Sequence, residues 1–284
     1  MRVYFLLIFL LKGTASQVIG GISPFGGIKI KFHLTHGGGR SCADPRLEFS
    51  DVAEMLLQLD FDRKLGAINR RKRCSSANSF TEALLPDENP HLLRKDTVRE
   101  LKLLFNTDET NVQMNSNDAF LNAIVDTDVM RCLEDYLKSK EFITRNLKDV
   151  LHEYWFTEYW RGHKTSSGFQ HVFQGEMKNG NVAGLHNWEG LKKKGYPFCF
   201  TKIAGLDKKG YVVEMRLKWR NQLKTVFVET SPELEMALYT LCFSFRTFGK
   251  RRDCFFYERM FYITTFKHVV GRKEVIEAAW PGVL

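Results

Sequence analysis

The pattern of apolar residues changes near Gly162, and this change limits the chain to one fold class. Before Gly162, apolar side chains recur at steps of three and four residues, as on one face of a helix, in segments 47–65, 97–105, 117–140 and 144–160. After it, short β-prone runs alternate with Gly, Asn and Pro, which is typical of antiparallel strands joined by turns. The sequence predicts an α+β fold, with a helical N-terminal lobe followed by antiparallel β-rich lobes.

Two β-prone runs, 168–175 and 210–219, illustrate the second half, since each is bounded by turn residues. One helix is expected to interrupt the sheet at 231–239. There, Ser231 is placed to cap the helix and Pro232 to occupy its first position.

The first residues have the pattern of a secretory signal. Arg2 precedes an apolar run from Val3 to Leu11, and small residues follow up to Ser16. We expect a signal peptide at 1–16, a glycine-rich flexible leader at 17–41 and a folded domain at 42–284, helical over about 42–162 and β-rich over about 163–284. An uncleaved anchor is the alternative, which Lys12 disfavours. No later run approaches ~20 apolar residues, so we expect a secreted protein without stable membrane insertion.

Six cysteines would meet an oxidising environment on this route, and they allow up to three disulfides in ~15 arrangements. The sequence alone does not choose among these arrangements. No Cys-x-x-Cys pair of the zinc-site type is present. The cysteines are Cys42, Cys74, Cys132, Cys199, Cys242 and Cys254.

The formal net charge is +9, and the basic residues gather at 70–73, 192–194, 208–209 and 250–252. Such clusters favour polyanionic partners, because contact with a phosphate backbone releases counterions. Each cluster taken alone also fits an ordinary solvated surface, and the first also fits a processing site.

Two histidines, His171 and His186, lie in similar settings of glycine, aromatic and polar residues. Two imidazoles and a lysine could supply the base, the acid and the cation that RNA cleavage by its own 2′-hydroxyl requires. A metal site built from His171, Glu176 and His186 is a second interpretation, because imidazole and carboxylate bind several divalent ions. Ordinary structural histidines are the third.

Three ordered strings surround these histidines: Ser-Gly-Phe-Gln-His-Val-Phe-Gln-Gly-Glu at 167–176, Gly-Leu-His-Asn-Trp at 184–188, and Thr-Ser-Pro-Glu-Leu-Glu-Met-Ala-Leu-Tyr at 230–239. Together they resemble the EndoU family of uridylate-preferring endoribonucleases, and segments 120–137 and 155–161 are similar to its helical half. The resemblance covers about residues 42–284. It implies that the protein cleaves single-stranded RNA at uridylates and leaves 2′,3′-cyclic phosphate and 5′-hydroxyl ends. It also implies a monomer that depends on a divalent cation, with Mn²⁺ expected and Ca²⁺ the alternative.

The resemblance also implies roles for individual residues. His171 is expected to be the acid and His186 the base. Lys224 best matches the third catalytic member, with Lys218 in reserve. Glu176 matches an acidic residue that is linked to activity and to the divalent ion, or that orients a histidine.

The chain departs from the family pattern in three places. Gln170 replaces a glutamate, which removes a charge that could raise the pKa of His171. Trp280 replaces a tyrosine that packs on the nucleotide, so it keeps an aromatic face without the hydroxyl. The stretch after Lys224 is short, which leaves three candidates for the uracil-contacting hydroxyl: Thr225, Thr230 and Ser231.

These departures motivate an alternative function. The chain would then be an RNA-binding or interaction protein with weakened catalysis on the same fold.

Overall fold

The computed structural model describes residues 20–22, 28–30, 41–60, 74, 90–106, 113–162, 164–206, 210–245, 249–256 and 259–284. Its contacts divide the chain into two units, Met1–Ser41 and Cys42–Leu284. In the first unit, β1 (Gly20–Ile22) pairs antiparallel with β2 (Ile28–Ile30), inside the segment expected to be a flexible leader. Three of the segments discussed above lie outside the described residues: the expected signal peptide and the basic clusters at 70–73 and 208–209.

The first half of the second unit is helical, as predicted, and consists of α1 (Phe49–Leu59), α2 (Pro90–Leu93), α3 (Asp96–Asn106), α4 (Gln113–Val125), α5 (Asp128–Ser139) and α6 (Leu147–Phe156). The periodic segment 117–140 is two helices rather than one. Thr127 separates them, because its hydroxyl accepts a hydrogen bond from the Met130 amide (3.3 Å) and caps α5. No helix in the described part of the chain is long and apolar enough to cross a membrane.

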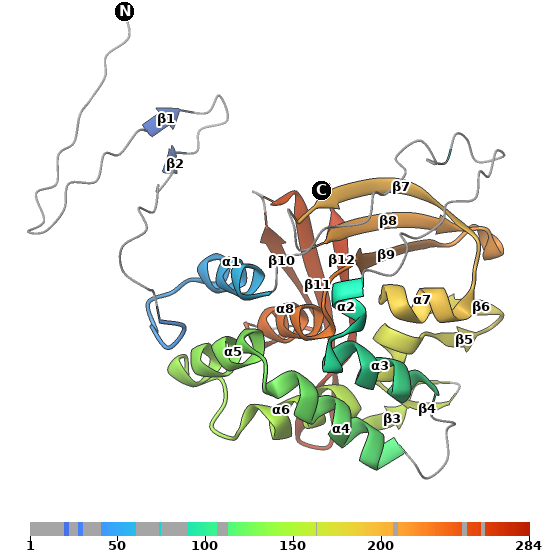
Figure 1. The fold of residues 1–284 in the computed structure, drawn as a ribbon, viewed down its shortest axis with the longest axis horizontal. Coiled ribbons are helices and arrows are strands. Elements are labelled where there is room, and N and C mark those ends of the chain that lie inside the picture. Colours follow the sequence, from blue (N-terminus) through green and yellow to red (C-terminus); the bar gives the residue numbers. More distant parts are fainter. Residues whose placement is uncertain are drawn as a thin grey trace, which may run out of the picture. The chain divides into compact units, whose positions relative to one another are not determined.

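Helix α8 (Pro232–Ser244) forms the centre of this unit (Figure 1). The predicted start is confirmed: the Ser231 hydroxyl accepts a hydrogen bond from the Leu234 amide at 3.2 Å, and Pro232 is the first helical residue. Every residue from 232 to 243 is buried, as in a helix surrounded by the core. Helices α1 and α5 and strands β10 and β11 pack around it.

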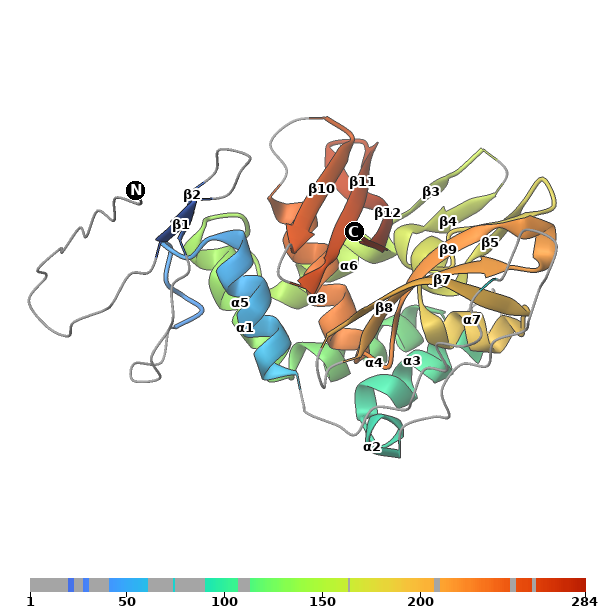
Figure 2. The same ribbon diagram turned by 90° about the horizontal axis from the view of Figure 1, so that it is seen from above.

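Antiparallel sheet dominates the second half, as predicted. One three-stranded sheet has the order β7 (Phe198–Gly205), β8 (Tyr211–Leu217), β9 (Leu223–Val228), and the other has the order β10 (Arg251–Phe256), β11 (Phe261–Val270), β12 (Lys273–Val283). Strand β12 packs against β8 and β9 and so joins the two sheets (Figure 2). Two short hairpins pair β3 (Glu158–Trp160) with β4 (Thr165–Ser167) and β5 (Glu176–Lys178) with β6 (Asn181–Ala183). The β5–β6 hairpin lies beside α7 (Trp188–Lys194) in both views.

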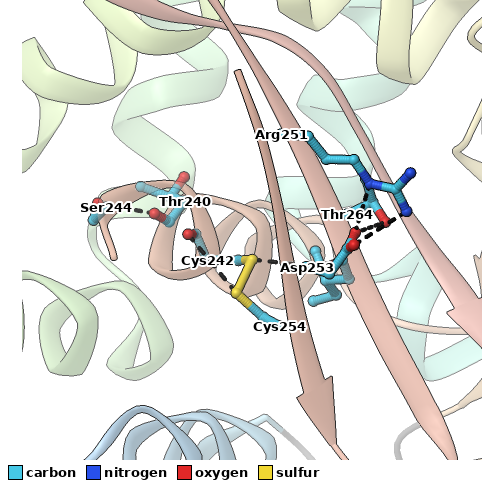
Figure 3. The surroundings of a disulfide bond; sticks show 8 residues. Thr240, Cys242, Ser244, Arg251, Asp253, Cys254 and Thr264 are labelled. Carbon is cyan, nitrogen blue, oxygen red and sulfur yellow. Dashed lines mark hydrogen bonds and ion pairs between the residues drawn. A yellow bond between two sulfur atoms is a disulfide. The ribbon is translucent and has the colours of Figure 1, made fainter. Parts of the chain in front are cut away.

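All six cysteines form disulfides, which resolves the pairing that the sequence left open. The bonds are Cys42–Cys132, Cys74–Cys199 and Cys242–Cys254. Figure 3 shows the third bond, which joins the end of α8 to β10, next to the hydrogen-bonded group of Arg251, Asp253 and Thr264. The first two bonds join residues 90 and 125 positions apart, and the third joins residues 12 positions apart. All three restrict the unfolded chain, the long loops most.

Candidate active site

His171 lies on a helical turn, not on the strand that the sequence predicted. The segment after Ser167 enters a helix that widens into the π-helical turn Gln170–Gln174. The correction has a packing reason: Phe169, Val172 and Phe173, at the three- and four-residue spacing of a helix, are all buried. The rings of Phe169 and Phe173 stack with centroids 4.8 Å apart. One side of the turn therefore packs into the core, and His171, on the other side, is half-buried at the surface.

Gln170 caps the start of this turn together with Ser167. The Ser167 hydroxyl accepts a hydrogen bond from the Gln170 amide (3.2 Å), and the Gln170 side-chain oxygen accepts one from the Ser167 amide (2.9 Å). This reciprocal pair is a capping box, which glutamine and glutamate form equally well. The local geometry that holds His171 therefore does not require a charge at position 170.

His171 is oriented by Glu176, the first residue of β5. The His171 Nδ1 atom lies 3.1 Å from Glu176 Oε2, which is also 3.4 Å from Arg161 Nε, and Ser166 donates a hydrogen bond to Oε1. Burial favours the neutral form of Glu176, but the hydrogen bonds from His171 and Ser166 and the charge of Arg161 outweigh it and lower the pKa of this carboxyl to about 2. Burial lowers the pKa of His171, while Glu176 opposes that change.

His186 is fixed by its backbone and by one ring nitrogen. Its amide donates to the Val172 carbonyl at 2.6 Å, and its Nδ1 lies 2.9 Å from the Thr225 carbonyl. A carbonyl only accepts, so Nδ1 carries the proton and Nε2 is left as a proton acceptor. Burial, and then the charge of Lys224, lower the pKa of His186 to about 3. This imidazole is therefore neutral at pH 7.

Gly184 lets the two histidine segments approach each other closely. The Leu185 amide donates to the His171 carbonyl at 2.9 Å. At Gly184 the backbone is left-handed (φ +66°), and a Cβ atom there would lie 1.9 Å from the His171 carbonyl oxygen. Only glycine fits both conditions without moving His171.

Lys224, on β9, is the lysine that joins the histidines. Its ammonium donates to the carbonyls of Val182 (2.6 Å) and Gly184 (2.8 Å), and burial lowers its pKa to about 8. Its acceptor Gly184 stands two residues before His186, and Leu185 between them bonds to the His171 carbonyl, so the three groups lie in one neighbourhood. The Lys224 charge lowers the pKa of both imidazoles. Lys218, the reserve candidate, is exposed at the turn before β9.

Trp280 and Thr225 lie at the edge of this group. Trp280, on β12, is partly exposed, and its ring stacks with those of His186 and Phe266, each with centroids 5.4 Å apart. Side chains alternate along a strand, so Thr225 shares a face of β9 with Phe227, opposite to Lys224. The Thr225 side chain is partly exposed.

Thr230 and Ser231, two of the candidates for the uracil contact, are buried in this structure and have hydrogen-bond partners within the protein. Thr230 is 1 % exposed, and its hydroxyl donates to Glu235 Oε1 at 2.6 Å. Ser231 is fully buried and caps α8. The short stretch after Lys224 leads directly into the central helix, so both hydroxyls serve its N-terminus.

The site residues do not fit a metal centre. Both oxygens of Glu176 are engaged by Ser166, His171 and Arg161, and the Nδ1 proton of His186 is held by a backbone carbonyl. Among the described residues, no group of three or more His, Cys, Asp or Glu side chains is arranged to hold an ion. In this structure His171 and Glu176 are hydrogen-bonded to each other, and His186 is hydrogen-bonded to the Thr225 carbonyl.

Sequence reasoning missed two supporting groups. Arg161, in a segment expected to be helical, extends from β3 to Glu176 and also donates to the Glu277 carbonyl at 3.0 Å. Asn187, next to His186, caps α7 and donates to Glu235 Oε2 at 3.1 Å. Burial raises the pKa of Glu235 to about 8. The Trp-Phe-x-x-Tyr-x-Arg string contained the signal for Arg161, whereas Asn187 resembles any helix cap.

Comparisons with known proteins identify the family of this chain. The family model described as Endoribonuclease XendoU matches residues 48–281. Uridylate-specific endoribonuclease C of Xenopus laevis is 38% identical over 143 residues, which cover 46% of this chain and 47% of that protein. The Uridylate-specific endoribonuclease of Homo sapiens is 37% identical over 143 residues, which cover 46% of this chain and 35% of that protein. The match thus spans about half the length, or less, of these curated relatives.

A solved structure, described as that of XendoU, a splicing independent snoRNA processing endoribonuclease, has the same fold. It superposes with a TM-score of 0.65 at 25% sequence identity and covers 83% of this chain and 97% of that one. The family model, which spans well over half of the chain, decides the assignment. This chain belongs to the XendoU family of endoribonucleases.

Proposed function

We propose that this chain is an endoribonuclease that cleaves single-stranded RNA at uridylates by attack of the ribose 2′-hydroxyl, giving 2′,3′-cyclic phosphate and 5′-hydroxyl ends. One observation carries the proposal: His171 and His186 lie in one neighbourhood with Lys224, and each imidazole has its Nδ1 held by a different acceptor. The names of the curated relatives support uridylate-specific cleavage.

His186 acts as the base in this mechanism. Its Nδ1 proton is held by the Thr225 carbonyl, so Nε2 takes the proton from the 2′-hydroxyl. The pKa of about 3 keeps the imidazole neutral in the free protein, so the Nε2 lone pair is available at pH 7. The hydroxyl belongs to the substrate, so positioning supplies much of the rate and no enzyme nucleophile is needed.

His171 acts as the acid and donates a proton to the leaving 5′-oxygen. Glu176 accepts from its Nδ1 and stabilises the imidazolium, which compensates for the burial that lowers its pKa. An arriving phosphate adds negative charge and raises this pKa further. Lys224 stabilises the charge on the phosphorane, with two of its three protons fixed by the Val182 and Gly184 carbonyls.

Uridine preference is assigned to the edge of the site formed by Thr225 and Trp280. Thr225 offers a partly exposed hydroxyl on β9, which packs against β12, the strand that carries Trp280. A hydroxyl can bond to the uracil edge, and an aromatic face can stack on a base.

Dependence on Mn²⁺ stays a prediction from the family resemblance, and no step above uses an ion. Chelation should abolish activity and Mn²⁺ should restore it. Full activity in the chelator would contradict this prediction.

Secretion is likewise proposed. The apolar run at 3–11 and the three disulfides both fit an oxidising export route. When cultured cells express the full chain, the medium should contain protein that begins near Ser16 or Gln17. Retention inside the cell with the original N-terminus would contradict it.

The proposed activity is tested by incubating the protein with single-stranded oligonucleotides that contain one uridine or one cytidine. We expect cleavage after the uridine and a cyclic phosphate at the new end, detected by mass spectrometry. RNA binding without turnover would support the alternative of a weakened enzyme, and equal cleavage at both bases would refute the uridine assignment.

The pH dependence of kcat/KM should reflect three groups. His186 stays neutral down to about pH 3, so no fall is expected between pH 7 and pH 5. As the pH rises, activity should first decline when His171 loses its proton, because burial has lowered the pKa of this imidazole below its ordinary value. Above about pH 8 the decline should become steeper, because the Lys224 ammonium then deprotonates. The variant Lys224→Arg, whose cation does not titrate, should lack the second decline. An acidic limb near pH 6.5 would contradict the assignment.

A further inference from the structure

An exposed aromatic cluster lies on the β5–β6 side of the molecule, outside the residues used above. Trp219, in the turn Trp219–Asn221 before β9, is 44% exposed, and its indole nitrogen donates to the Gly180 carbonyl at 3.1 Å. The Tyr196 ring lies 6.2 Å from it, and the Tyr196 hydroxyl contacts the Met177 sulfur at 3.8 Å. Met177 is 49% exposed. We call Met177, Tyr196 and Trp219 the Trp219 patch.

The turn holds the patch outward. Arg220 and Asn221 both have left-handed backbones, with φ of 50° and 55°. Residues other than glycine adopt this conformation at a cost in free energy. Arg220 also donates to the Asn179 carbonyl at 3.4 Å, so the turn is bound to the β5–β6 hairpin. A tryptophan held at the surface by a strained backbone indicates a role outside the core.

The surroundings of the patch are basic. From residue 215 to residue 223 the sequence has three Lys or Arg residues and no Asp or Glu. Lys178, on the hairpin, is exposed, as are Lys193 and Lys194 just before Tyr196. A solvated lysine face would need no aromatic side chains. Stacking surfaces among cations are instead the combination that single-stranded nucleic acid binds.

The patch is continuous with the active site through the same hairpin. Met177 directly follows Glu176, and Val182 on β6 accepts from Lys224. Between the two sites, the Gln222 side chain bonds to both the amide (3.0 Å) and the carbonyl (3.3 Å) of Val182. Figures 1 and 2 both show the β5–β6 hairpin beside α7 and the turn between β8 and β9. The β5–β6 hairpin therefore links the patch to the segment that carries the Lys224 contacts.

We propose that the Trp219 patch binds the nucleotides that flank the scissile uridylate, by stacking on Trp219 and by contact of their phosphates with the surrounding lysines. This inference rests on the proposed function, because the bound strand is the substrate itself. Stacking accepts any base, so the patch would add affinity without adding sequence preference.

The test compares two substrates, a uridine-containing oligonucleotide and a dinucleotide too short to reach the patch. In Trp219→Ala the ratio of kcat/KM for the oligonucleotide to that for the dinucleotide should fall about 5- to 150-fold. The control Phe255→Ala removes an aromatic side chain that is 42% exposed on β10, and it should leave this ratio unchanged. Equal losses on both substrates, or an unchanged ratio in Trp219→Ala, would overturn the proposal.

Binding of an uncleavable oligonucleotide, with 2′-deoxyuridine at the scissile position, separates this inference from the catalytic one. Trp219→Ala should weaken binding by a similar factor, and Lys178→Ala should reduce the slope of log affinity against log salt by about 1. Binding can be measured in this way even if the wild-type protein cleaves no RNA. Unchanged binding in Trp219→Ala would overturn the proposal, whether or not the protein cleaves RNA.

Discussion

Replacing His186 with alanine should lower kcat for cleavage of uridine-containing RNA by about 10²- to 10⁴-fold, the usual contribution of a positioned base. The pKa of about 3 and the bond from Nδ1 to the Thr225 carbonyl leave Nε2 of His186 as an acceptor at neutral pH, whereas His171 has its Nδ1 against the Glu176 carboxylate. The rate should be measured at saturating RNA, so that weaker binding does not enter.

The matched control is His152→Ala, which removes an exposed imidazole on α6 that packs on Phe156. It should cleave at the wild-type rate. Circular dichroism should show that His186→Ala is folded, and His186→Gln gives a second variant with a polar side chain. Wild-type rates in either His186 variant would remove the base from the mechanism.

Gly184→Ala should disable the enzyme although residue 184 takes no part in the chemistry. The new Cβ would lie 1.9 Å from the His171 carbonyl oxygen, so the turn that carries His171 must move. A displacement of about 1 Å in a catalytic group can cost about 10²-fold in rate. The left-handed backbone at this position adds about 1–2 kcal/mol of destabilisation.

Gly271→Ala separates the two effects. Gly271 has nearly the same backbone angle, φ +62°, but a Cβ there would meet no atom within 4 Å. This variant should lose stability in thermal unfolding and keep its activity, whereas Gly184→Ala should lose both. A fully active Gly184→Ala would show that the contact between the two histidine segments does not position His171.

The sequence predicted the α+β order well, because helical periodicity and capping are local properties. Ser231 and Pro232 marked the start of α8 correctly, since a cap acts within a few residues of itself. The turn that carries His171 was missed because a short apolar run looks the same in a strand and in a helix. What decides between them is the core around Phe169 and Phe173, which comes from distant segments.

The site was predictable only in part, for a similar reason. The motifs identified His171, His186 and Lys224, which the structure brings together. Thr230 and Ser231 could not be judged from sequence, because a hydroxyl that contacts a base and one that caps a buried helix are the same group. Disulfide partners were equally open, since pairing depends on which distant segments meet.

The account depends most on the substrate's own 2′-hydroxyl being the nucleophile that His186 activates. An oligonucleotide with a single uridine should be cleaved to a 2′,3′-cyclic phosphate, and the same strand with 2′-deoxyuridine at that position should remain intact. Cleavage of the deoxy strand at an equal rate would contradict the mechanism.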